Sequence, residues 1–169
     1  MSKGNRNFHS KQIGYELACG LQIGKQTVNA IYDWDNYSTY YHKDLLGANN
    51  NIIISSPVIS GPKVYELINL LKEKQMSGVQ ITIVTWAPDS YRFGDAAYWM
   101  QLHEDMRQAG FYIKTVEESC ERFAVIDQEV VWYGNINLLA KDKVDDSIMR
   151  ILSKEIASEL MEITFGDNG

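Results

Sequence analysis

Apolar and polar positions alternate through the middle of the chain in a pattern that predicts strands separated by helices. A continuous apolar run at residues 51–56, NIIISS, is bounded by Asn and Pro and is typical of a strand covered on both faces. Pro62 opens a helix whose apolar positions follow helical spacing as far as Gly78. The next elements are a strand at 79–86, a helix at 95–108 and a strand at 111–116. This β-α-β-α-β order predicts a layered α/β domain.

Shorter elements flank this central part. They are, in chain order, a strand at 27–33, a helix at about 39–46, strands at 122–126 and 129–133, and a strand at 147–152. Asp127 and Gln128 separate two of these strands and predict a hairpin, and Ser153 is placed to cap a final helix. The whole pattern predicts a single α/β domain over residues 26–169, a mixed β-sheet sandwiched between helices, preceded by a tail at residues 1–25.

Composition supports one compact domain and limits the cellular compartments in which the protein is expected. The chain has 169 residues, of which 45% are hydrophobic, enough for a substantial core. No apolar stretch approaches the length of a membrane span, and the polar start MSKGNRNFHSKQ is unlike a secretory signal. We therefore expect a cytoplasmic protein that does not contact a membrane.

The cysteines and histidines of the sequence do not form a recognisable metal or cofactor site. The two cysteines, Cys19 and Cys120, lie a hundred positions apart, and the three histidines lack the spacing of metal ligands. His103 lies in a polar stretch of a helix, LHEDM, where we expect a solvated side chain. We expect neither a metal nor a cofactor.

Charge limits how the chain could hold a nucleic acid. A formal net charge of −6 argues against a broadly basic binding surface, although it leaves room for a local basic cleft. Any hold on phosphate groups must then come from a few placed residues.

The segment at residues 120–137, CERFAVIDQEVVWYGNIN, carries the clearest chemical pattern. It resembles the signature of the phospholipase D superfamily, H-x-K-x-x-x-x-D followed after six residues by G-S-x-N. The six signature positions fall, in order, on Cys120, Arg122, Asp127, Gly134, Asn135 and Asn137. Asp, Gly and the last Asn are kept, Arg preserves the charge of Lys, and Cys for His and Asn for Ser are departures. We call this segment the degenerate motif.

The likeness extends over most of the chain, from about residue 28 to residue 163. The segments NIIISSPVIS, GVQITIV, RFAVIDQEVVWYGNINLLA and DDSIMRI, with the helices between them, resemble the phospholipase D-like domain appended to certain bacterial helicase or AAA-type ATPase proteins. The resemblance therefore implies a helicase or ATPase module as a partner.

The resemblance also implies a mechanism and an assembly. In the family two copies of the motif meet; one His attacks phosphorus and the other protonates the leaving oxygen. The Lys and the Ser/Asn positions hold the phosphoryl oxygens. A chain with one motif copy is expected to form a homodimer, and here that dimer would bring together two Cys120 residues.

Each motif residue has a functional and a structural interpretation. Cys120, Arg122 and Asp127 occupy the catalytic positions, and phosphate binding falls to Arg122, Asn135 and Asn137. Cys120 could equally be a small, half-buried substitute in an inactive site. Asp127 could serve only its turn, and the two asparagines could close a loop.

Three functions remain open from the sequence. The first is a non-catalytic or weakly catalytic phospholipase D-like module that binds a phosphodiester in DNA or RNA as an accessory unit of a helicase- or nuclease-type system. The second is an active metal-independent phosphodiesterase or nuclease that works as a homodimer. The third is a purely structural or interaction domain. Five aromatic residues could stack on bases or fill the core: Trp86, Tyr91, Trp99, Trp132 and Tyr133.

Overall fold

The computed structural model describes residues 29–90, 94–141 and 146–166. In these residues the strands are β1 (Ala30–Asp33), β2 (Asn51–Ser55), β3 (Gln80–Trp86), β4 (Tyr112–Val116), β5 (Phe123–Ile126), β6 (Val130–Gly134) and β7 (Ser147–Leu152). The helices are α2 (Tyr37–Leu46), α3 (Gly61–Met76), α4 (Ala96–Gln108) and α5 (Lys154–Phe165), and a 3-10 turn, η1, spans Pro88–Ser90. The expected tail at residues 1–25 lies outside the described residues.

The strands form one mixed sheet in the order β1-β7-β6-β5-β2-β3-β4. β2, β3 and β4 are parallel, and the remaining neighbours pair antiparallel. The β-α-β-α-β pattern therefore accounts for the parallel half, and the C-terminal strands add an antiparallel half beside β2.

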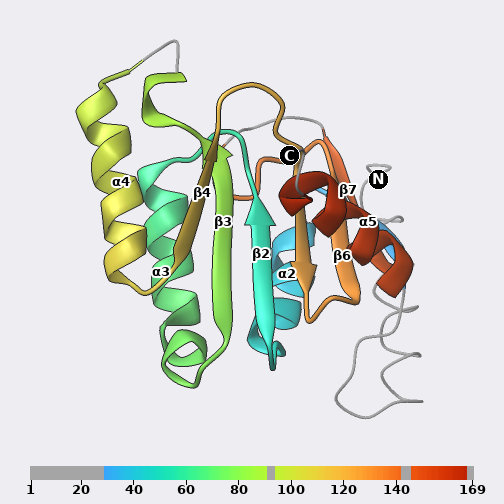
Figure 1. Cartoon of the computed structure of the whole chain (residues 1–169). Helices are drawn as coiled ribbons and strands as arrows, with labels where there is room; N and C mark the ends of the chain where they lie inside the picture. Colours follow the sequence, from blue (N-terminus) through green and yellow to red (C-terminus); the bar gives the residue numbers. More distant parts are fainter. Residues whose placement is uncertain (1–28, 91–93, 142–145, 167–169) are drawn as a thin grey trace, which may run out of the picture.

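Helices cover both faces of the sheet, as Figure 1 shows. A large core lies between the sheet and α2, α3 and α4, and a smaller one lies beneath α5. β2 contributes to both, because Ile52 and Ile54 face the large core and Ile53 faces α5. This explains the unbroken apolar run of this strand. The predicted α/β fold, a mixed sheet between helices, is confirmed.

The β5–β6 hairpin turns on Asp127 and Gln128, as the sequence predicts. Both have positive φ, 52° and 59°, which a two-residue type I′ turn requires. The Glu129 N–H donates to the Ile126 carbonyl at 3.2 Å and closes the turn. Neither residue is glycine, so an interaction elsewhere must stabilise this backbone conformation.

A buried ion pair ties α2 to the sheet. Arg150 Nε lies 2.7 Å from Asp44 Oδ2, and both side chains are buried. A second contact joins Arg150 Nη2 to Asp44 Oδ1 at 3.2 Å, and the Trp132 indole N–H donates to Oδ2 at 2.8 Å. The carboxylate is therefore held by two groups from neighbouring strands, β6 and β7.

His103 departs from its expected solvated position. It is 1% exposed, and within the described residues its Nε2 has no hydrogen-bond partner. It shares one face of α4 with Leu102 and Met106, because residues three and four apart lie on the same side of a helix. Burial, with a smaller contribution from Arg107, lowers the pKa of His103.

This buried histidine predicts a loss of stability in mild acid. The unfolded chain takes up a proton below a pKa of about 6.5 and the folded chain resists it, so stability is full above that pH and falls below it. His103→Leu should remove part of this pH dependence and cost little at neutral pH, since the buried Nε2 is unpaired. Urea unfolding at a series of pH values measures it; His42→Gln is the control for the second histidine. An unchanged slope in His103→Leu would contradict the prediction.

Candidate functional site at the degenerate motif

The degenerate motif brings its first and last residues to one edge of the sheet. Phe123, at the start of β5, pairs with Ser55 at the end of β2 and with Tyr133 near the end of β6. The residues before β5 and after β6 therefore lie beside the carboxyl end of β2, at the upper edge in Figure 1. In open α/β sheets this edge, where the strand order changes direction, is the usual place for a ligand.

Cys120 lies against Ser55 and lines an open pocket. Its sulfur is 3.4 Å from Ser55 Oγ, and that hydroxyl donates to the Glu121 carbonyl at 2.6 Å. The pocket, about 390 Å³, reaches the end of α5 and is also lined by Lys114 and Thr164. Burial raises the pKa of the Cys120 thiol, against the opposing effects of Ser55 and Arg122. The position of the family's histidine therefore holds a protonated thiol, a poor nucleophile.

Arg122 is anchored on one side and open on the other. Its Nε donates to Asn137 Oδ1 at 3.0 Å, and Asn137 is buried. Within the described residues the two terminal nitrogens of Arg122 make no hydrogen bond or ion pair. A fixed guanidinium fork with free donors suits an external phosphate.

Gly134 and Asn135 form the end of β6 at the same edge. A Cβ at Gly134 would lie 2.5 Å from the Ser147 carbonyl oxygen, so the close approach of β7 requires glycine here. The Asn135 N–H donates to that carbonyl at 3.2 Å, and its side chain is exposed. Asn135 can therefore present an amide at the edge near Arg122.

Asp127 lies at the other end of β5, away from Cys120 and Arg122. Its carboxylate accepts hydrogen bonds from the backbone N–H groups of Asn49, Asn50 and Asn51 at 2.7 to 3.1 Å. These bonds tie the hairpin turn to the segment before β2 and stabilise the positive φ of Asp127. The structure thus brings together five of the six motif positions and leaves Asp127 in a structural setting.

A family model described as the PLD-like domain of cardiolipin synthase matches residues 41–165. The chain belongs to the PLD-like domain family. A search of curated protein sequences found no match.

Solved structures agree on the fold of this PLD-like domain. Nuc from Salmonella typhimurium, a phospholipase D family member, matches with a TM-score of 0.64 at 14% identity, over 80% of this chain and 90% of that chain. NucT from Helicobacter pylori matches with a TM-score of 0.62 at 10% identity, over 80% and 92%. TrmBL2, an archaeal chromatin protein, matches with a TM-score of 0.58 at 13% identity, over 94% of this chain and 59% of that chain. At these identities the likeness concerns the fold alone.

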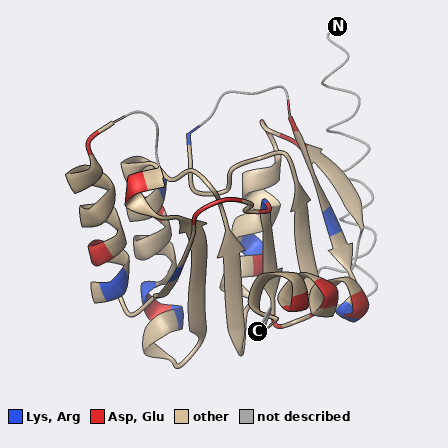
Figure 2. Cartoon of the chain, turned by 45° about the horizontal axis from the view of Figure 1, so that its top comes forward, with Lys and Arg blue, Asp and Glu red and all other residues tan. Residues whose placement is uncertain are grey.

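The motif edge of this PLD-like domain is acidic. Glu117, Glu118 and Glu121 are exposed between β4 and β5, and Figure 2 shows this run of acidic residues with the edge turned forward. We call these three residues the acidic edge. Glu121 accepts a hydrogen bond from the Tyr133 hydroxyl at 2.8 Å, which raises the pKa of Tyr133. Coulomb repulsion from this edge weakens any contact between Arg122 and a polyanion.

The histidines of the PLD-like domain do not replace the missing one. His42 lies 3.3 Å from Glu66, between α2 and α3, and His103 is buried on α4. Neither contacts Cys120 or Arg122 in the part of the chain that the structure describes. In those same residues no group of three His, Cys, Asp or Glu side chains could hold a metal ion.

The aromatic residues divide between core and surface. Trp132 is fully buried and packs on Tyr32 and Tyr41, so it is a core residue. Tyr133 is 38% exposed at the motif edge. Tyr91 lies outside the described residues. Of these, Tyr133 has the exposure and the place to contact a ligand.

The sequence interpretation missed Ser55 and the acidic edge. Ser55 is the last residue of an apolar strand, and its place at the strand end was the available signal. The three glutamates were visible in the sequence, but the pairing of β5 with β2 was needed to set them beside Arg122. No helix among the described residues has the length and apolar character to cross a membrane.

Proposed function

We propose that this PLD-like domain does not hydrolyse phosphodiesters through its motif and serves as a phosphodiester-binding accessory module. The ligand is a segment of DNA or RNA, and the module works beside a helicase- or ATPase-type partner. Two copies would pair across the motif edge, as the single motif copy suggests.

The observation that carries this proposal is the state of Cys120. The family's reaction needs a nucleophile and an acid near neutral pKa, and in a symmetric dimer the same position supplies both. A half-buried thiol whose pKa is raised serves poorly in the first role. It also gives no imidazolium for the second. Meanwhile the Arg122–Asn137 contact preserves a phosphate-binding donor fork.

One structural neighbour supports the proposal that the ligand is a nucleic acid. The structure of TrmBL2 is described as showing a novel mode of DNA binding by that chromatin protein. A phosphate contact made by Arg122, with Asn135 beside it, suits weak and salt-dependent binding to the phosphate backbone of a nucleic acid. Because the acidic edge repels phosphate groups, this binding must depend on Arg122 and Asn135 and not on the overall charge of the surface.

An assay of phosphodiester cleavage in the absence of metal distinguishes a binding module from an active enzyme. We expect the purified chain to cleave neither single- nor double-stranded DNA, nor a chromogenic phosphodiester, in EDTA, where metal-dependent contaminants are silent. Cys120→Ala should behave identically, and Cys120→His tests whether the scaffold still supports chemistry. If the native chain cuts and Cys120→Ala abolishes cutting, the chain is the metal-independent phosphodiesterase and our proposal is wrong.

Binding is tested with fluorescently labelled oligonucleotides and fluorescence anisotropy. Arg122→Gln should weaken affinity about tenfold and lower the slope of log affinity against log salt by about one, because one phosphate contact is lost. Arg107→Gln is the matched control, since Arg107 is an exposed arginine on α4 that pairs with Glu104. Equal affinity for the native chain and Arg122→Gln would favour a structural domain.

A further inference from the structure

One face of the parallel half of the sheet has no helix packed over its lower part among the described residues. Ile81, Ile83 and Ile113 pack in or against the large core, so the alternate residues of β3 and β4 point to the side of α5. Figure 1 shows α5 crossing the antiparallel half, with β3 and β4 beside it. Because parallel strands are usually covered on both faces, this exposed part of the sheet is unusual.

The residues of this surface are polar, with one aromatic ring. The surface, which we call the open sheet face, consists of Gln80, Thr82, Tyr112 and Lys114. Gln80 is exposed, Tyr112 is 62% exposed, and the other two are half-buried. Thr82 is directly opposite Tyr112 in the sheet. An exposed aromatic ring on a sheet, beside a cation and hydrogen-bonding groups, is typical of surfaces on which the bases of a nucleic acid stack.

The open sheet face is continuous with the motif pocket. Ser55 and Lys114 lie in one row across β2, β3 and β4, two strand spacings or about 10 Å apart. Lys114 and Cys120 line the same pocket of about 390 Å³. Tyr112 comes two residues before Lys114 on the same side of β4, so its backbone lies about 12 Å from Ser55. Three to four nucleotides, at a rise of about 3.4 Å each along one strand, span this distance.

Lys114 supplies the positive charge along this path. Its ammonium donates to the Thr164 carbonyl and lies 4.9 Å from the centre of the Phe165 ring, so the end of α5 holds the side chain in place. An ammonium has three donors, and Lys114 makes this one hydrogen bond within the described residues. A cation held in this way can contact a phosphate between Arg122 and a base on Tyr112.

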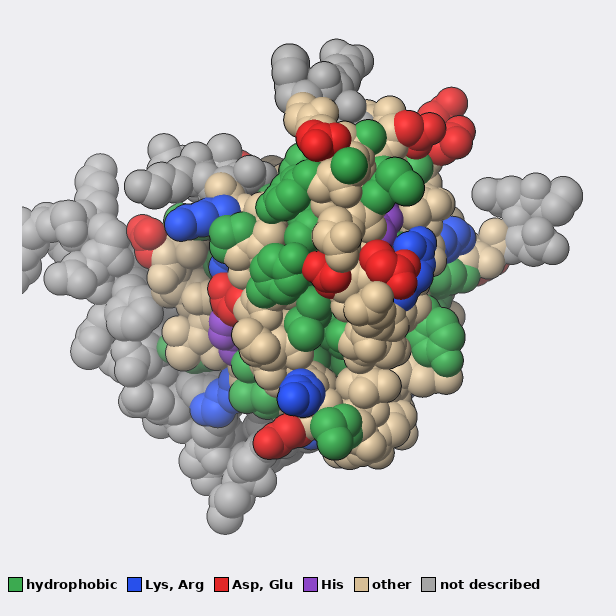
Figure 3. Space-filling model, turned by 90° about the vertical axis from the view of Figure 1, so that its left-hand side faces the viewer, with side chains coloured by type: hydrophobic (Ala, Val, Ile, Leu, Met, Phe, Trp, Pro, Cys, Tyr) green, Lys and Arg blue, Asp and Glu red, His purple; other side chains and the backbone are tan. Residues whose placement is uncertain are grey.

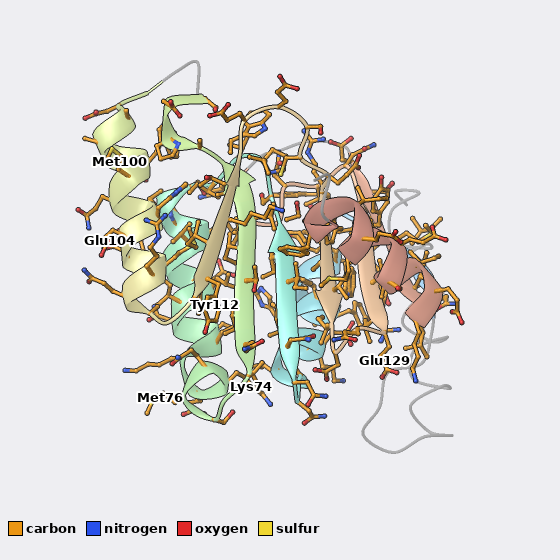
Figure 4. All side chains as sticks on the ribbon, in the orientation of Figure 1. Lys74, Met76, Met100, Glu104, Tyr112 and Glu129 are labelled. Atoms are coloured by element: carbon orange, nitrogen blue, oxygen red, sulfur yellow. The ribbon has the colours of Figure 1, made fainter. Side chains whose placement is uncertain are left out.

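Other exposed aromatic and apolar residues lie among charges on a different side of the molecule. Figure 3 shows the side of α4, where hydrophobic side chains alternate with acidic and basic ones. The hydroxyls of Tyr65 and Tyr98, on α3 and α4, make hydrogen bonds with neighbouring groups. In Figure 4, Met100 lies on α4 and Tyr112 lies beside β4. Single exposed residues such as Met100 are normal, whereas Tyr112 lies on a surface that leads to the motif.

The acidic edge gives a separate reason to expect a single strand. Duplex DNA carries one negative charge per about 1.7 Å of helix axis, and one strand carries one per about 3.4 Å. Repulsion from the three exposed glutamates therefore acts more strongly on a duplex brought to Arg122 than on one strand. A duplex also keeps its bases stacked inside the helix, where Tyr112 cannot reach them.

We propose that this site binds single-stranded nucleic acid, with one phosphate at Arg122 and the adjoining nucleotides on the open sheet face. There Lys114 contacts the backbone and a base stacks on Tyr112. This assignment rests on the proposed function and specifies its ligand more closely. The open sheet face lies outside the motif edge, so binding there is compatible with the pairing of two copies across that edge.

Fluorescence anisotropy with a labelled single strand and with the duplex of the same sequence tests this assignment. The native chain should bind the single strand several-fold more tightly. Tyr112→Ala should weaken single-strand binding about tenfold and leave duplex binding unchanged, because a base-stacking contact is lost. Tyr112→Phe, which keeps the ring, should bind as the native chain does. Tyr65→Ala, at another exposed tyrosine, is the matched control, and urea unfolding verifies that each variant is folded.

A photocrosslink locates the strand without any substitution in the protein. A single strand that carries 5-bromouracil should crosslink to β4 of the native chain on irradiation, and peptide mapping should identify Tyr112. Crosslinks confined to the antiparallel half of the sheet would overturn the proposed path.

The role of the acidic edge is tested by removing two of its charges. Glu117→Gln/Glu118→Gln should raise duplex affinity more than single-strand affinity and so narrow the preference several-fold. Glu104→Gln is the matched control, because Glu104 is an exposed glutamate on α4. An unchanged preference would show that the acidic edge does not discriminate between the two ligands and would contradict this part of the proposal.

The possible results distinguish a failure of this assignment from a failure of the proposed function. If Arg122→Gln weakens binding while Tyr112→Ala binds as the native chain does, the proposed function stands and the open sheet face is not part of the site. A duplex bound as tightly as the single strand also overturns the assignment. If Tyr112→Ala changes self-association in sedimentation and not binding, the face is an interface between copies. If the native chain binds neither ligand, both proposals are wrong.

Discussion

Asp44→Ala should lower the free energy of unfolding by about 3–5 kcal/mol, the largest single loss that we expect in this chain. The substitution leaves the Arg150 charge buried without its carboxylate, and removing one partner of a buried pair has a cost of this size. It also removes the acceptor of the Trp132 indole N–H. Urea unfolding at neutral pH measures the loss.

A double variant separates the contribution of the ion pair to stability from the contribution of packing. In Asp44→Leu/Arg150→Met both charges are gone, so no unpaired charge stays buried, and the unpaired Trp132 N–H has a penalty of about 1–3 kcal/mol. The double variant should therefore be more stable than Asp44→Ala. If the two replacements instead destabilise additively, the pair is not the coupled unit that its 2.7 Å contact indicates.

Asp127→Ala should lower the free energy of unfolding by about 3 kcal/mol while leaving affinity for a phosphodiester unchanged. The carboxylate accepts three backbone N–H groups. Hydrogen bonds to a charged group are worth about 1.5–3 kcal/mol each, but the bonds from Asn49 and Asn50 are exposed and water can replace them, so the expected total stays near the value of one or two such bonds. Alanine also tolerates the positive φ of this position poorly. Stability is followed by urea unfolding, and affinity by the same anisotropy assay as for Arg122→Gln.

Asp127→Asn is the matched control for this turn residue. Asparagine keeps one acceptor oxygen and adopts positive φ readily, so its loss of stability should be clearly smaller. The contrary result would be a stable Asp127→Ala variant that no longer binds its ligand. That outcome would return Asp127 to the binding site, as the catalytic position in the signature implies.

The local pattern was enough to predict most of the fold. The apolar run NIIIS identified β2 as a strand covered on both faces, and the Asp127-Gln128 step identified the hairpin. Ser153 was predicted as a cap, and its hydroxyl accepts from the Ile156 N–H at 3.1 Å. These features depend on neighbours within a few positions, which a sequence displays directly. Element bounds differ from the expected ones by one to three residues at several ends.

Long-range contacts were the part that the pattern could not supply. Asp44 is polar at a helical position and is separated from Arg150 by 106 residues, so nothing local marks it as buried. His103 was misplaced because its polar neighbours obscured the buried face of α4. At the motif, the spacing located Cys120 and Arg122. The Ser55 contact and the acidic edge emerged only once β5 was paired with β2.

The two ends of β5 have a consequence for how such motifs evolve. The residues of the signature have two separable roles. Those at the start of β5 can take part in chemistry, and Asp127, at the end of β5, stabilises a turn. A lineage that gives up hydrolysis is free to change the first set, yet any change to the second threatens folding itself. We therefore expect an aspartate retained in a signature of this kind to reflect the needs of the scaffold, and the positions at the motif edge, the histidine position first, to report on the reaction.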